Sequence, residues 1–154
     1  MGGLPLKYAH VETERRFLVH AVPDGVTRVS EITDRYIDGT RLRLREVTTE
    51  GVTTRKLGQK VRLGAGPGRI AHTSMYLSDA EWSLLCNLPA RILRKRRHHV
   101  ERDGLVIAVD QFDDGSFVAE VDGGDQRAAD PPAWLRVIRE VSDDEAFTGA
   151  GRAW

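Results

Sequence analysis

Polar and apolar residues alternate along most of this chain, a pattern that is typical of half-buried β-strands. The clearest example is the segment 41–45, in which arginines alternate with leucines. Turn signals such as Asp38-Gly39 and Asp103-Gly104 separate the alternating segments. The expected strands span residues 11–19, 29–37, 41–45, 52–61, 69–77, 92–102, 105–112 and 117–122. Eight strands joined mostly by short turns predict an antiparallel meander that is closed into a barrel or strongly curved.

Helices are expected at only a few places. Ser78 and Glu81 have the spacing of a capping box at the start of a helix, and Pro89 ends that helix. The remaining expectations are a short helix at 133–139, a helical turn capped by Ser142 and a flexible loop at 64–68. The predicted fold class is therefore α+β and mainly antiparallel β, an eight-stranded closed barrel with a few helices packed outside it.

Charged residues fall on one face of several expected strands, because side chains two residues apart share a face. The sets that share a face are Glu12, Glu14 and Arg16; Arg41, Arg43 and Arg45; Lys95, Arg97 and His99; and Glu120 and Asp122. An ordinary sheet with one face in water would account for such charges. An inverted barrel would account for them as well, with its apolar faces turned outward and a polar lumen inside. The charge pattern alone leaves both interpretations open.

A polar lumen of this kind would suit a polyanion together with a divalent metal ion. Guanidinium groups pair with phosphate oxygens in a fork, and carboxylates bind hard cations. Walls of low dielectric constant would strengthen both kinds of contact. The tunnel interpretation therefore predicts a phosphate ligand, whereas the solvated sheet predicts none.

The composition places the chain among soluble single-domain proteins. Its 154 residues predict one domain, with a core at about residues 8–148 and a tail at 149–154. Lys and Arg number 23, as do Asp and Glu, so no net charge favours nucleic acid or a membrane surface. Cys86 is the one cysteine, which excludes an internal disulfide and suits a reducing cytosol. With no membrane-length apolar run and no signal-peptide pattern, we expect a cytoplasmic protein.

Several segments resemble landmarks of the CYTH superfamily, the triphosphate tunnel metalloenzymes. Glu12-x-Glu14-x-Arg16 is similar to the ExExK signature of that family. Further similar segments follow in family order between residues 11 and 147, at 42–45 (LRLR), 54–58 (TRKLG), 95–98 (KRRH), 109–112 (VDQF), 119–122 (AEVD), 134–135 (WL) and 140–147. Each landmark is weak alone, but together and in register they make a strong resemblance.

The resemblance implies a metal-dependent hydrolase of a triphosphate, in which water attacks the terminal phosphorus. The substrate would be inorganic tripolyphosphate, thiamine triphosphate or a nucleoside triphosphate, and the cofactor Mg²⁺ or Mn²⁺. The implied substrate-binding residues are Arg43, Arg45, Lys56, Lys95 and Arg97. The implied metal ligands are Glu12, Glu14, Glu120, Asp122 and Asp110, and Arg16 and Lys56 are the candidate catalytic residues.

The chain also departs from the family pattern. Arg16 stands in place of the signature lysine, and Asp122 stands where a glutamate is usual. No carboxylate occurs between Gly64 and Ser78, which implies the loss of a second metal ion or of a carboxylate that orients water. The alternative function is therefore a binding module of the same fold that holds nucleotides or polyphosphate without turnover. Adenylyl cyclase activity is a lesser option, since no adenine pocket is evident in the sequence.

Other partners are weighed from the same charges. The basic run at 94–99 could suggest a nucleic-acid surface, but the zero net charge and the alternation of its residues between two faces argue against it. The expected partners are a triphosphate-containing small molecule or inorganic polyphosphate, with no membrane. A homodimer is an option that the sequence leaves open.

Overall fold

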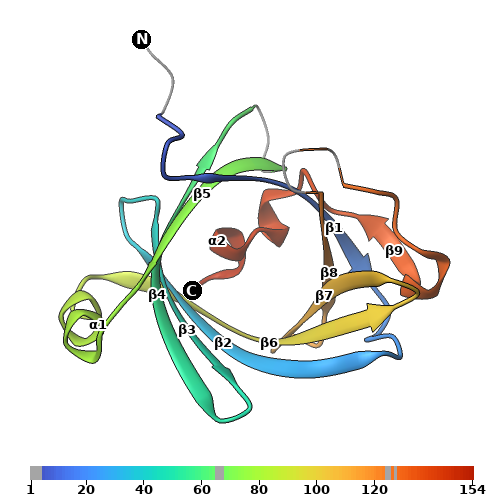
Figure 1. The fold of residues 1–154 in the computed structure, drawn as a ribbon, viewed down its shortest axis with the longest axis horizontal. Helices are drawn as coiled ribbons and strands as arrows, with labels where there is room; N and C mark the ends of the chain where they lie inside the picture. Colours follow the sequence, from blue (N-terminus) through green and yellow to red (C-terminus); the bar gives the residue numbers. More distant parts are fainter. Residues whose placement is uncertain (1–4, 65–67, 124–125, 127) are drawn as a thin grey trace.

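Eight antiparallel strands form a closed barrel, and a ninth strand is added at its side (Figure 1). This computed structural model describes residues 5–64, 68–123, 126 and 128–154, so most of the expected loop at 64–68 lies outside the described residues. The barrel strands are β1 (His10–Val19), β2 (Val26–Ile37), β3 (Leu42–Thr49), β4 (Val52–Arg62), β5 (Arg69–Tyr76), β6 (Ala90–Arg102), β7 (Leu105–Phe112) and β8 (Phe117–Asp122). Their neighbour order is β5-β4-β3-β2-β6-β7-β8-β1, and β1 pairs with β5 to close the ring. The eight-stranded antiparallel barrel predicted from the alternation is confirmed.

The chain beyond β8 corrects one prediction. The helix expected at 133–139 is only a 3-10 turn, η1 (Ala133–Leu135), after which Arg136 takes a left-handed conformation with φ 54°. The chain then continues as β9 (Val137–Glu140), which pairs with β1 on the edge opposite β8. A short isolated helix would have left many backbone groups of this segment without hydrogen-bond partners. Pairing with β1 supplies such partners to residues 137–140.

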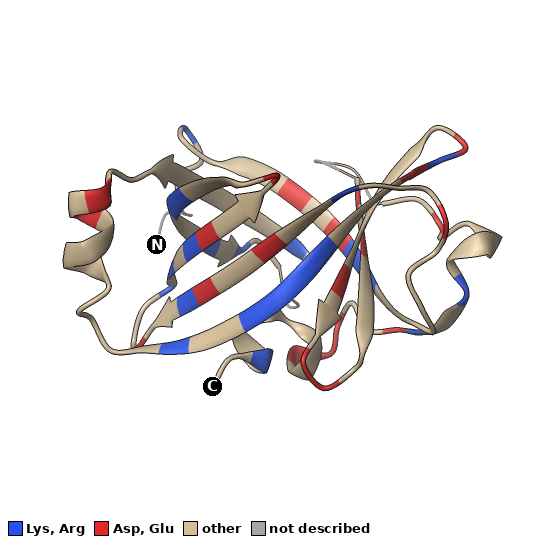
Figure 2. Ribbon diagram, turned by 90° about the horizontal axis from the view of Figure 1, so that it is seen from below, with Lys and Arg blue, Asp and Glu red and all other residues tan. Residues whose placement is uncertain are grey.

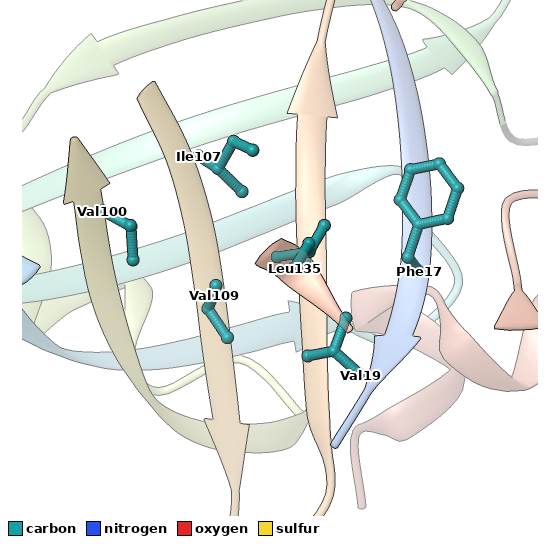
Figure 3. Close-up of a cluster of buried hydrophobic side chains, with 7 residues drawn as sticks. Phe17, Val19, Val100, Ile107, Val109 and Leu135 are labelled. Carbon is teal, nitrogen blue, oxygen red and sulfur yellow. The ribbon is translucent and has the colours of Figure 1, made fainter. Parts of the chain in front are cut away.

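The main hydrophobic cluster lies on the outer face of the barrel wall. Its buried members come from four strands and η1: Phe17, Val19, Val100, Ile107, Val109, Ala119 and Leu135. Figure 3 shows Leu135 of η1 reaching the strand side chains, and it is fully buried there. Each strand member of the cluster alternates with a residue on the opposite face, so the apolar sides of β1, β6, β7 and β8 point away from the lumen. The barrel is therefore inverted: on these strands the apolar faces point outward and the charged faces line the cavity.

The inner face of the barrel carries the sets of charged residues that share a strand face in the sequence, among them Glu12, Glu14 and Arg16. Figure 2 shows acidic and basic positions interspersed with uncharged ones along the strands. Register brings them side by side, since Glu14 opposes Asp122 and Arg16 opposes Glu120 across the β1–β8 ladder. The inner face is not polar throughout: Ile32, which opposes Lys95, is also buried on it.

The helices contribute little to the core. Helix α1 (Asp79–Leu85) has the predicted capping box between Ser78 and Glu81, but none of its residues is buried. Leu84 is 72% exposed, whereas Trp82 and Leu85 are half-buried and the Trp82 ring lies 5.5 Å from the guanidinium of Arg55 on β4, so α1 packs on the barrel through part of its apolar side only. None of the helices in the described part of the chain has the length and hydropathy needed to span a membrane.

The C-terminal segment, which includes the expected tail at 149–154, contains regular structure. It forms a 3-10 turn, η2 (Glu145–Phe147), followed by α2 (Gly149–Arg152). These turns are capped by Asp144 and Thr148, whereas Ser142 accepts a hydrogen bond from the backbone of Arg16. Trp154 and Ile92 exchange both backbone hydrogen bonds, which holds the end of the chain against β6. In Figure 1 α2 lies within the ring of strands rather than outside it.

Candidate functional site

The barrel encloses a cavity of about 570 Å³ whose lining is strongly charged. Its cationic side chains come from β1, β3, β4 and β6 and from the turn before β3: Arg16, Arg41, Arg43, Arg45, Lys60, Arg62, Arg91, Lys95 and Arg97. Its carboxylates are Glu12, Glu14, Glu120 and Asp122. Like charges repel, so such a set of cations is stable only with carboxylates or a bound anion between them. The lining therefore defines a cavity suited to a multiply charged anion.

Asp34 holds two of the arginines in place from below the cavity surface. Its side chain is fully buried, and its two oxygens each accept a hydrogen bond of 2.7 Å from Arg45. The Nε of Arg43 lies 3.9 Å from the same carboxylate. Burial would raise the pKa of Asp34, but the hydrogen bonds and charge of Arg45, with the charge of Arg43, lower it to about 2. Asp34 is thus a fixed anion that orients Arg43 and Arg45. These arginines, with the other cationic side chains of the lining, form the basic wall of the cavity.

Asp110 does the same for Lys95 and Arg97, two more of the predicted phosphate ligands. Arg97 donates to both of its oxygens at 2.7 and 2.9 Å, and the Nζ of Lys95 lies 2.8 Å away. Burial opposes ionisation of Asp110, but the charges of Lys95 and Arg97 hold its pKa well below the usual range. Both oxygens of Asp110 are therefore paired with cations, and Asp110 holds Lys95 and Arg97 in position in the basic wall.

The carboxylate cluster lies where β1 and β8 pair. Glu14 and Asp122 are opposed in register, and Glu120 accepts a hydrogen bond of 3.1 Å from Arg97. Burial and the negative charge of Glu120 raise the pKa of Glu14 above its usual value. This crowding of like charge is the electrostatic condition that a divalent cation relieves. Within the described ranges, no three Asp, Glu, His or Cys side chains form a ready-made metal-binding group.

Glu12 has partners that the sequence did not suggest. His72 of β5 places its Nδ1 2.9 Å from one oxygen of Glu12, and the Nζ of Lys60 lies 4.0 Å from the other. Burial would raise the pKa of Glu12, but the hydrogen bond to His72 and the charge of Lys60 lower it to about 2. Glu12 is therefore an ionised partner of two basic side chains.

The structure places Lys56 apart from the cavity lining. Its Nζ lies 5.5 Å from the ring centroid of Tyr76, its register partner on β5. Lys60, on the same strand face two positions beyond Gly58, lines the cavity instead. The Nζ of Lys60 is 3.9 Å from Glu14, so it stands between the carboxylates and the basic wall.

Arg16 joins the cavity to the C-terminal segment. Its Nη2 donates to the backbone oxygen of Ser142 at 2.9 Å, and its Nη1 lies 3.8 Å from Glu14. Arg62, the last residue of β4, forms a bidentate ion pair with Glu145 of η2. The start of α2 completes the lining through Thr148, Gly149 and Ala150. A segment expected to be a tail is therefore part of the site.

The site as a whole contains most of the residues predicted for it. Ten of the eleven candidates line the cavity or anchor residues that do; Lys56 lies outside. The residues that sequence reasoning missed are Asp34, Gly58, Lys60, Arg62, His72 and Arg91. The period of two could have found Lys60 and Arg62, since they share a face with Lys56 along β4.

Comparison with solved structures supports the fold. The inorganic triphosphatase NE1496 has a TM-score of 0.57 and 19% sequence identity, over 92% of this chain and 93% of that chain. A second structure of NE1496, described as a hypothetical protein, has a TM-score of 0.58 and 21% identity over 92% and 97% of the two chains. PH1819 from Pyrococcus horikoshii OT3 has a TM-score of 0.57 and 15% identity over 79% and 80%.

The sequence itself matches no protein-family model and no curated protein. At identities near 20%, likeness of structure establishes a shared fold and does not transfer an activity. The chain shares the barrel fold of these proteins, which agrees with the fold that the resemblance in sequence implied.

Proposed function

We propose that this protein binds a triphosphate in the barrel cavity and hydrolyses it with the help of a divalent cation. The observation that carries the proposal is the convergence of nine cationic side chains and four carboxylates on one enclosed cavity. The nine cations outnumber the four lining carboxylates even together with Asp34, Asp110 and Glu145, which pair with some of them, so a ligand with several negative charges balances the cavity better than a singly charged one. A chain of linked phosphates, each with several negative oxygens, matches both their number and their spread along the lumen.

The basic wall would bind the phosphate oxygens. Asp34 orients Arg45, and Asp110 orients Arg97. These arginines would therefore lose little further conformational freedom when their remaining N–H groups bind a phosphate. Lys95 is buried, and burial with the neighbouring charges of Arg97 and Arg45 lowers its pKa although Asp110 opposes this. A bound polyanion would favour the charged form of Lys95.

The carboxylates of Glu14, Glu120 and Asp122 would hold the cation, Mg²⁺ or Mn²⁺. They suit it because they are oxygen ligands gathered on adjacent strands, with the ionisation of Glu14 opposed by its neighbours. When bound, the metal would supply charge neutralisation at the phosphate oxygens. Glu12 and Asp110 are assigned instead to the basic side chains that they contact.

Lys60 and Arg16 are the proposed catalytic cations. Both lie beside Glu14, the lysine at 3.9 Å and the arginine at 3.8 Å. A phosphate held near the carboxylates would meet these two positive charges at its reacting end. They would stabilise the additional negative charge that develops as water attacks the terminal phosphorus. Lys56, which lies at Tyr76, has no part in this proposal.

A second candidate is a module that binds the same ligand without turnover. It is favoured by one observation: Glu12 is hydrogen-bonded to His72 at 2.9 Å and lies 4.0 Å from the Nζ of Lys60, so it is paired with basic side chains and the acidic set left for a metal ion is small. In that case the cavity would retain the ligand and release no phosphate.

Phosphate release separates the two candidates. Tripolyphosphate, ATP and thiamine triphosphate would be incubated with the protein and Mg²⁺ or Mn²⁺, with Glu14→Gln as the control variant. Metal-dependent release that the variant lacks establishes the hydrolase, and the best substrate names its specificity. No release from any of the three, with tripolyphosphate still raising the melting temperature, establishes the binding module. Neither release nor a shift in melting temperature would refute both.

A further inference from the structure

The cavity lining contains a histidine that the proposed function does not use, His99 of β6. It shares the inner face of β6 with Lys95 and Arg97, because side chains two residues apart point the same way. Its Nε2 lies 3.0 Å from the hydroxyl oxygen of Ser30 on β2, which in turn lies 2.7 Å from that of Thr49 on β3. These contacts hold the imidazole in one orientation.

The other ring nitrogen of His99 is available to a ligand. Its Nδ1 has no hydrogen-bond partner in the described part of the chain, and this atom is not buried. His72, the other histidine among the described lining residues, differs in both respects, since its Nδ1 is held by Glu12 and its Nε2 is buried. Of these two histidines, His99 is therefore the one that offers the cavity an accessible nitrogen.

A small residue separates His99 from the carboxylate cluster. His99 opposes Ala108 across the β6–β7 pairing, and Ala108 opposes Glu120 across the β7–β8 pairing. Directly opposed Cβ atoms are about 5 Å apart, so those of His99 and Glu120 are separated by at most about 10 Å. All three residues line the cavity, and the side chain of Ala108 ends at its Cβ. This leaves room for a water molecule between the imidazole and the carboxylate.

The surroundings of His99 favour its neutral form. The charged and titratable groups around the ring come from β2, from β7 and from β6 itself: Arg28, Asp110, Arg97 and His98. Burial lowers the pKa of His99 below its ordinary value of 6.5, the charges of the two arginines lower it further, and Asp110 opposes them. The neutral imidazole, which can accept a proton, is therefore the main form at pH 7.

We propose that His99 is the general base of the hydrolysis and that Ser30 positions it. This proposal rests on the proposed function, because it assigns a role in that reaction. A water molecule above Ala108 gives a proton to the Nδ1 of His99 while its oxygen bonds to the terminal phosphorus. The bond from that phosphorus to the bridging oxygen breaks, and its electron pair leaves with the shortened phosphate chain. His99 then returns the proton to solvent.

The position of His99 agrees with the reacting end of the ligand in the proposed function. Arg16 opposes Glu120 across the β1–β8 pairing, so a catalytic cation and a proton acceptor lie on either side of one metal-binding carboxylate. The sequence between Gly64 and Ser78 has no carboxylate that could orient the attacking water. His99 takes over that task from another strand.

The proposal is tested by the pH dependence of tripolyphosphate hydrolysis with Mg²⁺, over the range in which histidines titrate, about pH 5 to 8. The proteins are the wild type, His99→Gln, Ser30→Ala and the matched control His98→Gln. His98 hydrogen-bonds Gln111 at 3.0 Å and lies on the opposite face of β6 from His99. NMR would titrate the His99 imidazole in the wild type without metal or substrate, and calorimetry would measure tripolyphosphate binding to each protein.

We expect His99→Gln to lower kcat at pH 7 by about 100-fold or more, the lower end for loss of a general base, with unchanged tripolyphosphate affinity. The wild-type kcat/KM should fall as the pH drops through the pKa that NMR gives for His99, because protonation removes the base. His99→Gln should lack this fall, and His98→Gln should keep it. Ser30→Ala retains the imidazole, so it should lower kcat less and keep the fall. Titration of the substrate affects all four proteins alike, so the differences between their profiles decide.

Three results would overturn the proposal. If the wild type hydrolyses tripolyphosphate and His99→Gln keeps both its kcat and the fall at low pH, His99 is not the base and the proposed function stands. If His99→Gln does not fold, a wild-type profile whose pKa differs from the NMR titration of His99 refutes the proposal. If the wild type releases no phosphate, the proposed hydrolysis fails and the general base fails with it.

Discussion

At the scale of single residues, the site is organised by buried aspartates rather than by the arginines that would contact a ligand. Asp34 and Asp110 are fully buried, and each holds two cationic side chains of the wall. An arginine with a bidentate carboxylate partner has lost most of its rotamer freedom before any ligand arrives. These aspartates therefore combine a structural role with pre-organisation of the cavity.

The pairing of Asp34 predicts a loss of stability in acid. Its pKa is lowered to about 2 in the folded protein, so its contribution is present above the unfolded pKa near 4 and is lost as the pH falls through that range towards 2. We expect the free energy of unfolding to lose about 2 kcal/mol from this group between pH 5 and pH 2. Urea unfolding at a series of pH values would measure it. The Asp34→Asn variant should lack this part of the dependence, and parallel curves for the two proteins would contradict the prediction.

Asp110→Asn should be strongly destabilising. The substitution leaves Lys95 and Arg97 buried beside a neutral amide, and breaking a buried ion pair costs about 3–5 kcal/mol. Denaturant unfolding at neutral pH would give the value. Glu31→Gln is the matched control, since its ion pair with Arg96 is exposed and should change stability by less than about 1 kcal/mol. Similar losses in both variants would mean that burial of Asp110 has no energetic consequence.

At the scale of elements, the barrel wall depends on a segment that lies outside it. The turn η1 places Leu135 among apolar side chains of β1, β6, β7 and β8, and β9 then pairs with β1. An inverted barrel cannot bury its apolar faces in its own lumen, so it needs an external cover. Here the cover over four strands is a 3-10 turn with one short strand.

Leu135→Ala should therefore destabilise the whole barrel. Leu135 is fully buried, and removal of a buried leucine side chain costs about 2–5 kcal/mol. Leu84→Ala makes the same chemical change on α1, where the side chain is 72% exposed, and should stay within about 0.5 kcal/mol of the wild type. Thermal and denaturant unfolding of the two variants would check the difference. A small effect at Leu135 would show that η1 does not stabilise the wall.

At the scale of the whole molecule, the distribution of charge is more informative than its sum. Positive and negative residues balance at 23 each, yet nine cationic side chains line one cavity. A long polymer such as duplex DNA could not reach side chains on the inside of a barrel, whereas a small polyanion could. The zero net charge also provides no long-range attraction for nucleic acid.

The chain should consequently distinguish a small polyanion from a large one. At about 0.15 M salt we expect no binding of a short DNA duplex at concentrations up to about 100 μM, the weak end of non-specific affinities. Tripolyphosphate should bind under the same conditions. Fluorescence anisotropy for the duplex and calorimetry for tripolyphosphate would compare them, and tight duplex binding with a steep salt dependence would contradict the assignment of the basic residues to the cavity.

The sequence by itself determined the strands and the shared faces of their charges. Side chains two residues apart lie on one side of any strand, so Glu12, Glu14 and Arg16 had to share a face whatever the rest of the chain did. The same local rule located the capping box of α1. It could not say which face would be the lumen, because that depends on closure of the sheet.

Tertiary structure alone decided which side chains meet across the lumen. Register between strands placed Lys60 rather than Lys56 in the cavity, opposite His72, and brought His72 to Glu12 over 60 positions of the sequence. It also drew residues 137–140 into a strand, because β1 had an edge available for pairing. Contacts of this kind depend on how the whole chain packs, whereas alternation depends only on neighbouring residues. The fold of this protein could therefore be predicted from the alternation of neighbouring residues. The contacts within its site depend on the pairing of strands that are distant in the sequence.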